Sequence, residues 1–154
     1  MASEPPAWLQ RGLVKIYFAC SITGGRDDED IYRQLVDAML AAGHDVPTSI
    51  NASAETLHME TDHAPETVYS RDIAWLEVSD VLVAELSTPS HGVGYEIAYA
   101  LDLDKPVLCL YQRDVKVSKM LTGNDRPGLQ IHSYADGQEA LNLLADFLSG
   151  LSPN

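Results

Sequence analysis

Apolar positions along the chain alternate between short continuous runs and helically spaced stripes. The runs are rich in branched and aromatic residues, which is typical of strands buried on both faces of a sheet. They cover 14–20, 80–86, 105–111 and 129–134. The stripes have apolar residues three or four positions apart, which predicts helices. They lie around 31–40, 69–76, 93–103 and 141–148.

A shorter run at 46–50 predicts a fifth strand, which Pro47 confines to an edge of the sheet. Apolar strands that alternate with helices predict a parallel sheet covered on both faces, with right-handed crossovers. A length of 154 residues fits one such domain. We expect it to span 13–150, after a flexible N-terminal arm at 1–12.

Charge narrows the possible partners. The chain has 23 acidic against 10 basic residues, a net charge of −13. A surface this acidic repels a phosphate backbone, so nucleic acid polymers are poor candidates, whereas a small phosphate compound needs only one pocket of donors. No apolar run reaches the roughly 18–20 residues of a membrane helix, and no signal peptide is evident. We expect the protein to lie in the cytoplasm, with the nucleus as a second candidate location, and to bind no membrane.

The loop after the first strand has the chemistry of an anion site. Residues 21–26 read Ser-Ile-Thr-Gly-Gly-Arg and precede a predicted helix. Hydroxyls, backbone N–H groups at the double glycine and a guanidinium together suit a phosphate. The spacing matches neither the dinucleotide fingerprint nor the triphosphate loop, which favours a monophosphate. An ordinary strand-to-helix turn is the alternative.

A second informative loop follows the strand at 80–86. It contains Ser90, Gly92 and Glu96, and the last is expected in the first turn of the next helix. A carboxylate there either stabilises the helix dipole by about 0.3–1 kcal/mol or, kept ionised, serves as a nucleophile. Asp72 follows an arginine in the preceding helix, a pattern that alone is typical of a solvated charge. The histidines lack the further close-spaced ligands of a zinc site, so no metal is expected.

Together these segments resemble the 2'-deoxynucleoside 5'-phosphate N-hydrolases of the nucleoside 2-deoxyribosyltransferase superfamily. The matching segments are 17–26, 71–76, 80–85 and 89–96, and Gly-Val-Gly-Tyr-Glu, ending at Glu96, is the most specific of them. The resemblance implies a flavodoxin-like (Rossmann-like), doubly wound α/β domain with a five-stranded parallel sheet. It also implies hydrolysis of 2'-deoxynucleoside 5'-monophosphates to a free base and 2-deoxyribose 5-phosphate, without a cofactor.

The resemblance further implies roles for individual residues. Glu96 would attack C1' of the deoxyribose and form a covalent glycosyl-enzyme, Asp72 would serve as acid or base at the nucleobase, and Tyr17 would stand beside the sugar. The residues implied for the phosphate site are Cys20, Ser21, Ile22, Thr23, Gly24, Gly25, Arg26, Ser90 and Gly92.

Two further implications concern the partner subunit and the base. Ser118 matches a serine that reaches the phosphate from the neighbouring subunit of a homodimer. Ile50 aligns with a histidine of the base pocket in animal hydrolases, which also differ at Cys20 and Thr23. Because Thr23 and Ile50 lie toward the base, the preferred nucleobase stays open.

Three alternative functions remain. A nucleoside 2-deoxyribosyltransferase would pass the sugar to a second base, but the Ser21, Arg26 and Ser90 cluster argues against unphosphorylated substrates. A pyrimidine ribonucleotide N-hydrolase of the CMP type would use the same chemistry. A noncatalytic nucleotide-binding module would use Glu96 only as a helix cap.

Overall fold

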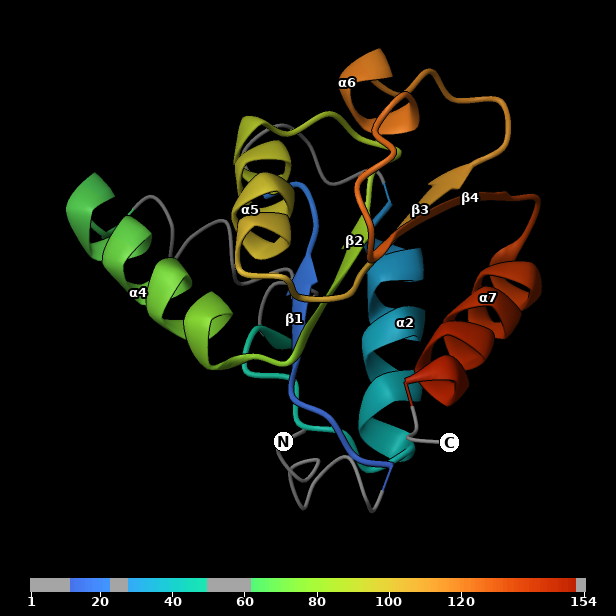
Figure 1. Ribbon diagram of the computed structural model, residues 1–154, viewed down its shortest axis with the longest axis horizontal. Coiled ribbons are helices and arrows are strands. Elements are labelled where there is room, and N and C mark those ends of the chain that lie inside the picture. The colour runs from blue at the N-terminus through green and yellow to red at the C-terminus, as the bar shows by residue number, and fades with distance from the viewer. Residues whose placement is uncertain (1–11, 23–27, 50–61, 152–154) are drawn as a thin grey trace.

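Four parallel strands form one sheet, and their order in space follows their order in the chain (Figure 1). The computed structural model describes residues 12–22, 28–49 and 62–151. The strands are β1 (Ile16–Ala19), β2 (Val81–Glu85), β3 (Val107–Gln112) and β4 (Leu129–Tyr134). The helices are α2 (Glu29–Ala41), α4 (Pro65–Val78), α5 (His91–Asp102), α6 (Lys119–Thr122) and α7 (Gly137–Gly150).

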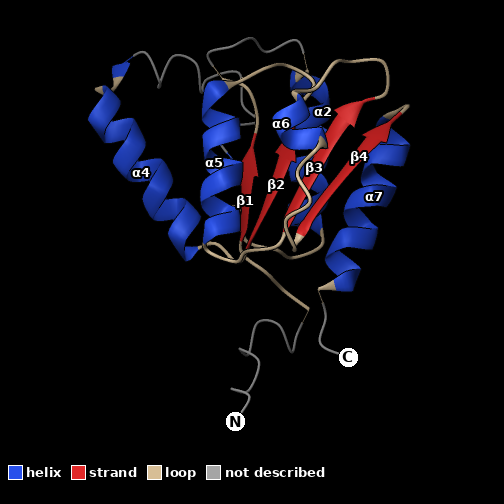
Figure 2. Cartoon of the chain, turned by 45° about the horizontal axis from the view of Figure 1, so that its top comes forward, coloured by secondary structure: helices blue, strands red, loops and turns tan. Residues whose placement is uncertain are grey.

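Alternate residues of each strand enter two separate cores. Along β1, Ile16 and Phe18 pack with α2 and α7, whereas Tyr17 and Ala19 pack with α5 on the opposite face. Figure 2 shows α5 between α4 and the sheet, with α2 behind the strands. The predicted α/β class, a parallel sheet with helices on both faces, is therefore confirmed.

The predicted fifth strand is wrong for the residues that the structure describes there, 46–49. The chain pairs with β1 only at an isolated parallel bridge between Lys15 and Asp45. Asp45 N–H donates to Val14 O and Ile16 N–H donates to Asp45 O, so the next donor of the ladder would be residue 47. Pro47 has no N–H, and pairing stops.

A side chain replaces the missing strand partner. Phe18 N–H donates to Thr48 Oγ1 over 2.7 Å, and Thr48 is fully buried. The chain then turns, with Ser49 N–H donating to Val46 O. The strand edge thus keeps its buried donor satisfied without a fifth strand.

The remaining sequence-based boundaries are mostly close to those observed. Gly43 directly follows the last turn of α2 with a φ of 91°, a left-handed conformation that glycine adopts readily.

Cys20 and Cys109 are buried free thiols, and burial raises the pKa of Cys109 to about 12. The predicted arm at 1–12 lies, apart from Gly12, outside the described residues. Within the described ranges, every helix is too short or too polar to cross a membrane.

The Thr48 contact predicts a measurable stability effect. Thr48→Val keeps the shape but leaves the buried Phe18 N–H without its acceptor, so the free energy of unfolding should fall by about 1–3 kcal/mol. Thr48→Ser keeps the hydroxyl and loses one methyl, and should cost only about 1 kcal/mol. Urea denaturation measures both variants. A valine variant as stable as wild type would contradict this account of the strand edge.

Candidate active site

A cavity of about 420 Å³ lies between α4 and α5. Asp72 from α4 and Glu96 from α5 both line it, together with Gly92 at the start of α5. The other lining residues are His63, Pro65, Val68, Tyr69, Ile73 and Tyr95. The fold thus brings the two carboxylates proposed for catalysis to one cavity.

Tyr17 lies near these carboxylates, on the face of β1 that packs with α5. Its side chain is fully buried, and its hydroxyl makes no hydrogen bond of ordinary length within the described residues. Burial first, and then the nearby carboxylates of Glu96 and Asp72, raise the pKa of Tyr17 far above its usual value. The phenol therefore stays protonated, with its O–H available as a donor toward Glu96.

Glu96 lies one turn deeper in α5 than expected from the sequence. The helix begins at His91, not Val93, so the first turn contains no acidic residue. Ser90 is the N-cap, and its Oγ accepts from Val93 N–H over 3.3 Å. Because the helix-dipole effect fades beyond the first turn, capping does not account for Glu96. This weakens the alternative of a noncatalytic module.

The first turn of α5 places Ser90 close to Glu96. A Cβ built on Gly92 would lie 3.8 Å from Ser90 Oγ and 3.9 Å from Glu96 Oε1. The glycine thus keeps open the space between the hydroxyl and the carboxylate. Any ligand in that space meets both groups.

Asp72 is held by its neighbour in the chain. Arg71 Nε donates to Asp72 Oδ1 over 2.9 Å, and both side chains are about one-fifth exposed. The guanidinium also lies 5.0 Å from the centre of the Trp75 ring, a cation–π contact. Asp72 is therefore a partly buried, oriented carboxylate and not the solvated charge that its sequence context alone suggests.

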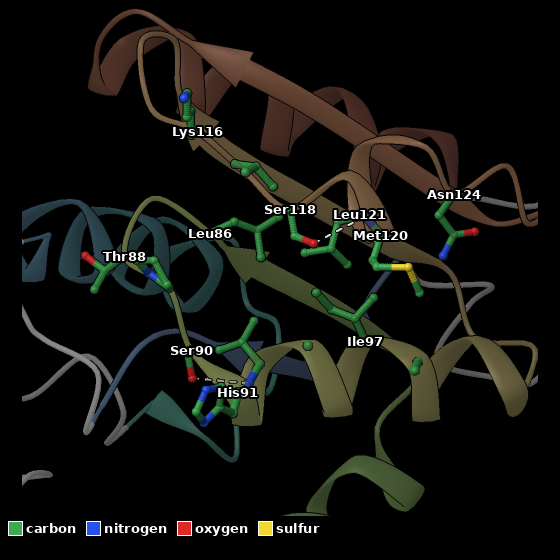
Figure 3. Close-up of a pocket in the computed structure, with 15 residues that line it drawn as sticks. Leu86, Thr88, Ser90, His91, Ile97, Lys116, Ser118, Met120, Leu121 and Asn124 are labelled. Atoms are coloured by element: carbon green, nitrogen blue, oxygen red, sulfur yellow. Dashed lines mark hydrogen bonds between the residues drawn. The ribbon is translucent and has the colours of Figure 1, made fainter.

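Ser90 and Ser118 line a second cavity of about 450 Å³ (Figure 3). Ser90 belongs to the start of α5, and Ser118 caps α6 by accepting from Met120 N–H over 3.2 Å. Most of the remaining lining is apolar, including Leu86, Val93 and Ile97. The two serines thus face one cavity within a single chain.

The loop predicted to bind phosphate is only partly described. Cys20 and Ser21 are buried and Ile22 is half-buried. Ser21 Oγ has no hydrogen-bond partner in the described part of the chain. The remaining predicted residues, Thr23, Gly24, Gly25, Arg26 and Ile50, lie outside the described residues.

Sequence reasoning missed two aromatic residues of the first cavity. Tyr69 and Tyr95 line it with their rings 6.2 Å apart and their hydroxyls 3.3 Å apart. Tyr69 looked like part of the buried stripe of α4, but it is 54% exposed. Its position three residues before Asp72, on the same helix face, was the available signal. Among the described residues, no His, Cys, Asp or Glu group of three or more is arranged to hold a metal ion.

This geometry defines a class of protein: a doubly wound α/β domain with two carboxylates at one cavity and a buried tyrosine near both of them. Residues 16–143 match the sequence model described as nucleoside 2-deoxyribosyltransferase. The chain belongs to the nucleoside 2-deoxyribosyltransferase family.

Similar proteins support this assignment. A Methanosarcina mazei protein provisionally named 2'-deoxynucleoside 5'-phosphate N-hydrolase 1 is 39% identical over 141 residues, covering 92% of this chain and 88% of its own. The 5-hydroxymethyl-dUMP N-hydrolase of Danio rerio is 33% identical, over 92% of this chain and all of its own. The Clostridium botulinum CMP N-glycosidase has a similar fold, with a TM-score of 0.67 at 16% identity over 86% of this chain and 98% of its own.

The cap assignment predicts different stabilities for two variants. Ser90→Ala removes the N-cap acceptor and should lower the free energy of unfolding by about 1 kcal/mol. Glu96→Gln should leave it unchanged or raise it, because it removes one of two neighbouring negative charges and no cap. Thermal and urea denaturation measure both. A larger loss for Glu96→Gln than for Ser90→Ala would restore Glu96 as a capping residue.

Proposed function

We propose that the protein hydrolyses the N-glycosidic bond of 2'-deoxynucleoside 5'-monophosphates, giving a free nucleobase and 2-deoxyribose 5-phosphate. The broader prediction, an enzyme of the N-glycosidase class, is confirmed by relatives named as N-hydrolases over most of the chain. The observation that carries the specific proposal is that Asp72 and Glu96 line one cavity, with the buried Tyr17 hydroxyl near both carboxylates.

The first chemical step uses Glu96 as the nucleophile. Its carboxylate oxygen forms a bond to C1' while the bond from C1' to the base nitrogen breaks, and the electron pair of that bond leaves with the base. Asp72, oriented by Arg71, lies on the opposite helix; in its protonated form it donates its proton to the departing base and is left as the carboxylate for the second step. The neutral Tyr17 phenol orients the Glu96 carboxylate before attack.

The second step hydrolyses the ester. Asp72 takes a proton from water as the water oxygen attacks C1', and the bond between C1' and Glu96 breaks with its electrons returning to the carboxylate. The products are 2-deoxyribose 5-phosphate and the regenerated enzyme. Tyr17, buried beside the sugar position, fills the space that a 2'-hydroxyl would need, which favours deoxyribose.

The substrate's phosphate is proposed to bind at the start of α5. Ser90 Oγ accepts one hydrogen bond as the cap and keeps its own O–H free to donate, and the helix N-terminus favours an anion. The absence of a Cβ at Gly92 gives a ligand access to the backbone next to Glu96. Ser21 and the loop that follows it are proposed to complete this phosphate site.

We also propose a homodimer in which Ser118 reaches the phosphate site of the neighbouring subunit. The short helix α6 exposes 83% of Met120, and Lys116 lines the Ser118 cavity. An apolar, lysine-bearing segment eases contact between two chains of net charge −13.

A substrate panel tests the function directly. Wild-type protein should release free base from deoxynucleoside monophosphates, including 5-hydroxymethyl-dUMP, and act poorly on ribonucleotides such as CMP and on deoxynucleosides without phosphate. Phosphate binding positions the sugar for attack, so its loss should lower kcat/KM strongly. Equal kcat/KM for a nucleoside and its monophosphate, or sugar transfer to an added base, would favour the transferase. Preferred cleavage of CMP would favour the ribonucleotide hydrolase.

Glu96→Gln tests the nucleophile. The amide keeps the shape but cannot form the ester, so turnover should fall far more than tenfold, while calorimetry still detects nucleotide binding. Ser90→Ala is the matched control, because it should raise KM for phosphorylated substrates and leave most of kcat. A Glu96→Gln rate within about tenfold of wild type, roughly 1.4 kcal/mol of barrier, would remove Glu96 from that role.

Subunit mixing tests the role of Ser118. Ser118→Ala protein and inactive Glu96→Gln protein are mixed under conditions in which subunit exchange is shown separately. If Ser118 acts across the dimer, one site of the mixed dimer has an intact Glu96 and an intact partner serine, so activity should exceed that of either variant alone. No gain after exchange, or a monomer at the assay concentration, would place Ser118 outside the neighbouring site.

A further inference from the structure

Glu85, the last residue of β2, is a charged side chain in an otherwise apolar, buried strand. It is fully buried, and three donors meet its two oxygens. Ser87 N–H donates to Oε2 over 3.1 Å, whereas Ser87 Oγ and the Tyr134 hydroxyl both donate to Oε1, the latter over 2.8 Å. None of the steps proposed above uses this carboxylate.

The charge on Glu85 does not serve stability. Burial is the main cause that raises its pKa to about 6, while the donors from Ser87 and Tyr134 oppose that rise. A carboxyl whose folded pKa lies above its unfolded value is protonated more readily in the folded state, so its contribution to stability grows as pH falls from 7 toward 5. At neutral pH the folded protein therefore keeps an ionised group at a cost in stability.

The contacts of Glu85 fix the turn that leads to the proposed phosphate site. Ser87 Oγ, which donates to Glu85, also accepts from Gln112 N–H at the end of β3 over 2.8 Å. Glu85 itself accepts from Tyr134 at the end of β4. Ser87 thereby attaches the turn after β2 to the adjacent strand β3, and Tyr134 ties Glu85 to β4 beyond it. Ser90 follows this turn and caps α5.

A second pair of contacts attaches the same turn to the start of α2. Thr88 Oγ1 donates to Asp28 Oδ2 over 2.7 Å, and Gln112 Nε2 donates to Asp28 Oδ1 over 2.8 Å. Asp28 directly precedes α2 and follows the loop that contains the Gly-Gly-Arg segment. Ser87, Thr88 and Gln112 thus link Glu85 to Asp28, directly before α2, and to the turn that precedes Ser90.

We propose that Glu85 is a positioning residue for the phosphate site, which acts through Ser87 to set the place of Ser90 and Gly92. The proposal deepens the proposed function, because the phosphate role of Ser90 rests on it. Protonation turns one oxygen of Glu85 from a hydrogen-bond acceptor into a donor. One of the hydrogen bonds that hold the turn is then lost, and the turn loosens. Phosphate binding should then weaken while the fold gains stability.

The titratable groups that face Glu85 are Asp28 before α2, Tyr32 on α2 and Tyr134 on β4. Burial raises the pKa of both tyrosines, so both stay neutral between pH 5 and 8. The negative charge of Asp28 contributes to the raised pKa of Glu85. Glu85 is therefore the group in this network whose charge changes near pH 6.

Kinetics of Glu85→Gln against pH test the proposal. At pH 7.5, KM for a deoxynucleoside monophosphate should rise roughly three- to tenfold, the effect of one hydrogen bond, with kcat within about twofold of wild type. The KM of wild type should climb toward that of the variant below pH 6. The phosphate of the substrate also titrates near pH 6, but this cancels in the ratio of the two enzymes.

Tyr134→Phe is the matched control. It removes one donor to Glu85 from the β4 side and leaves both Ser87 contacts, so it should lower Tm without changing KM. Equal KM changes in Glu85→Gln and Tyr134→Phe, or no KM change in Glu85→Gln, would overturn the positioning role. If Glu85→Gln fails to fold, Ser87→Ala removes the hydroxyl link and must raise KM in its place.

An arm independent of catalysis uses amide NMR of the protein without ligand. The Ser90 and Gly92 resonances should shift with a midpoint near pH 6, and Glu85→Gln should abolish that shift. Both proteins carry His91→Asn, which removes the imidazole directly after Ser90 as a separate source of shift changes. Shifts confined to Ser87 would overturn the proposal. Should wild type hydrolyse no nucleotide, the proposed function fails, and this arm still decides whether Glu85 positions Ser90.

Discussion

A sheet that is buried on both faces excludes most polar side chains from its strands, and this constraint determines where the reactive groups of the molecule lie. The middle strands place apolar residues in both cores, so most reactive groups lie where strands end or where helices begin. Tyr17 and Glu85 are buried polar groups that belong to the strands themselves. The hydroxyl of Tyr17, on β1, lies near two carboxylates. Glu85, at the end of β2, accepts three hydrogen bonds.

We assign these two buried groups different roles, Tyr17 beside the reacting carboxylate and Glu85 in positioning the phosphate site. Tyr17 stays protonated because burial and the charges of Asp72 and Glu96 oppose its ionisation, and so it remains a donor beside the proposed nucleophile. Glu85 ends β2 and accepts from Ser87 and Tyr134, and Ser87 also joins the turn before α5 to β3. In the mechanism we propose, one buried group orients the nucleophilic carboxylate, and the other orients the turn before the helix that carries that carboxylate.

Much of this arrangement could be predicted from the sequence, and the failures have physical causes. The four strands and main helices follow from periodicity, because burial on both faces enforces apolar runs. The strand at 46–50 was wrong because Pro47 lacks the donor that pairing requires, and Thr48 supplies an acceptor that no pattern reveals. Glu96 was placed in the first turn because the polar residues His91 and Gly92 concealed the true start of α5.

The stereochemistry of transfer to methanol tests the central claim, that Glu96 forms a covalent bond to C1'. When methanol replaces water in the second step, the product is a methyl glycoside that cannot interconvert between anomers, and proton NMR assigns its configuration. Two displacements through Glu96 predict the same anomeric configuration as in the nucleotide. The inverted anomer would show a single displacement by solvent, with Glu96 acting as a base, and would contradict the account.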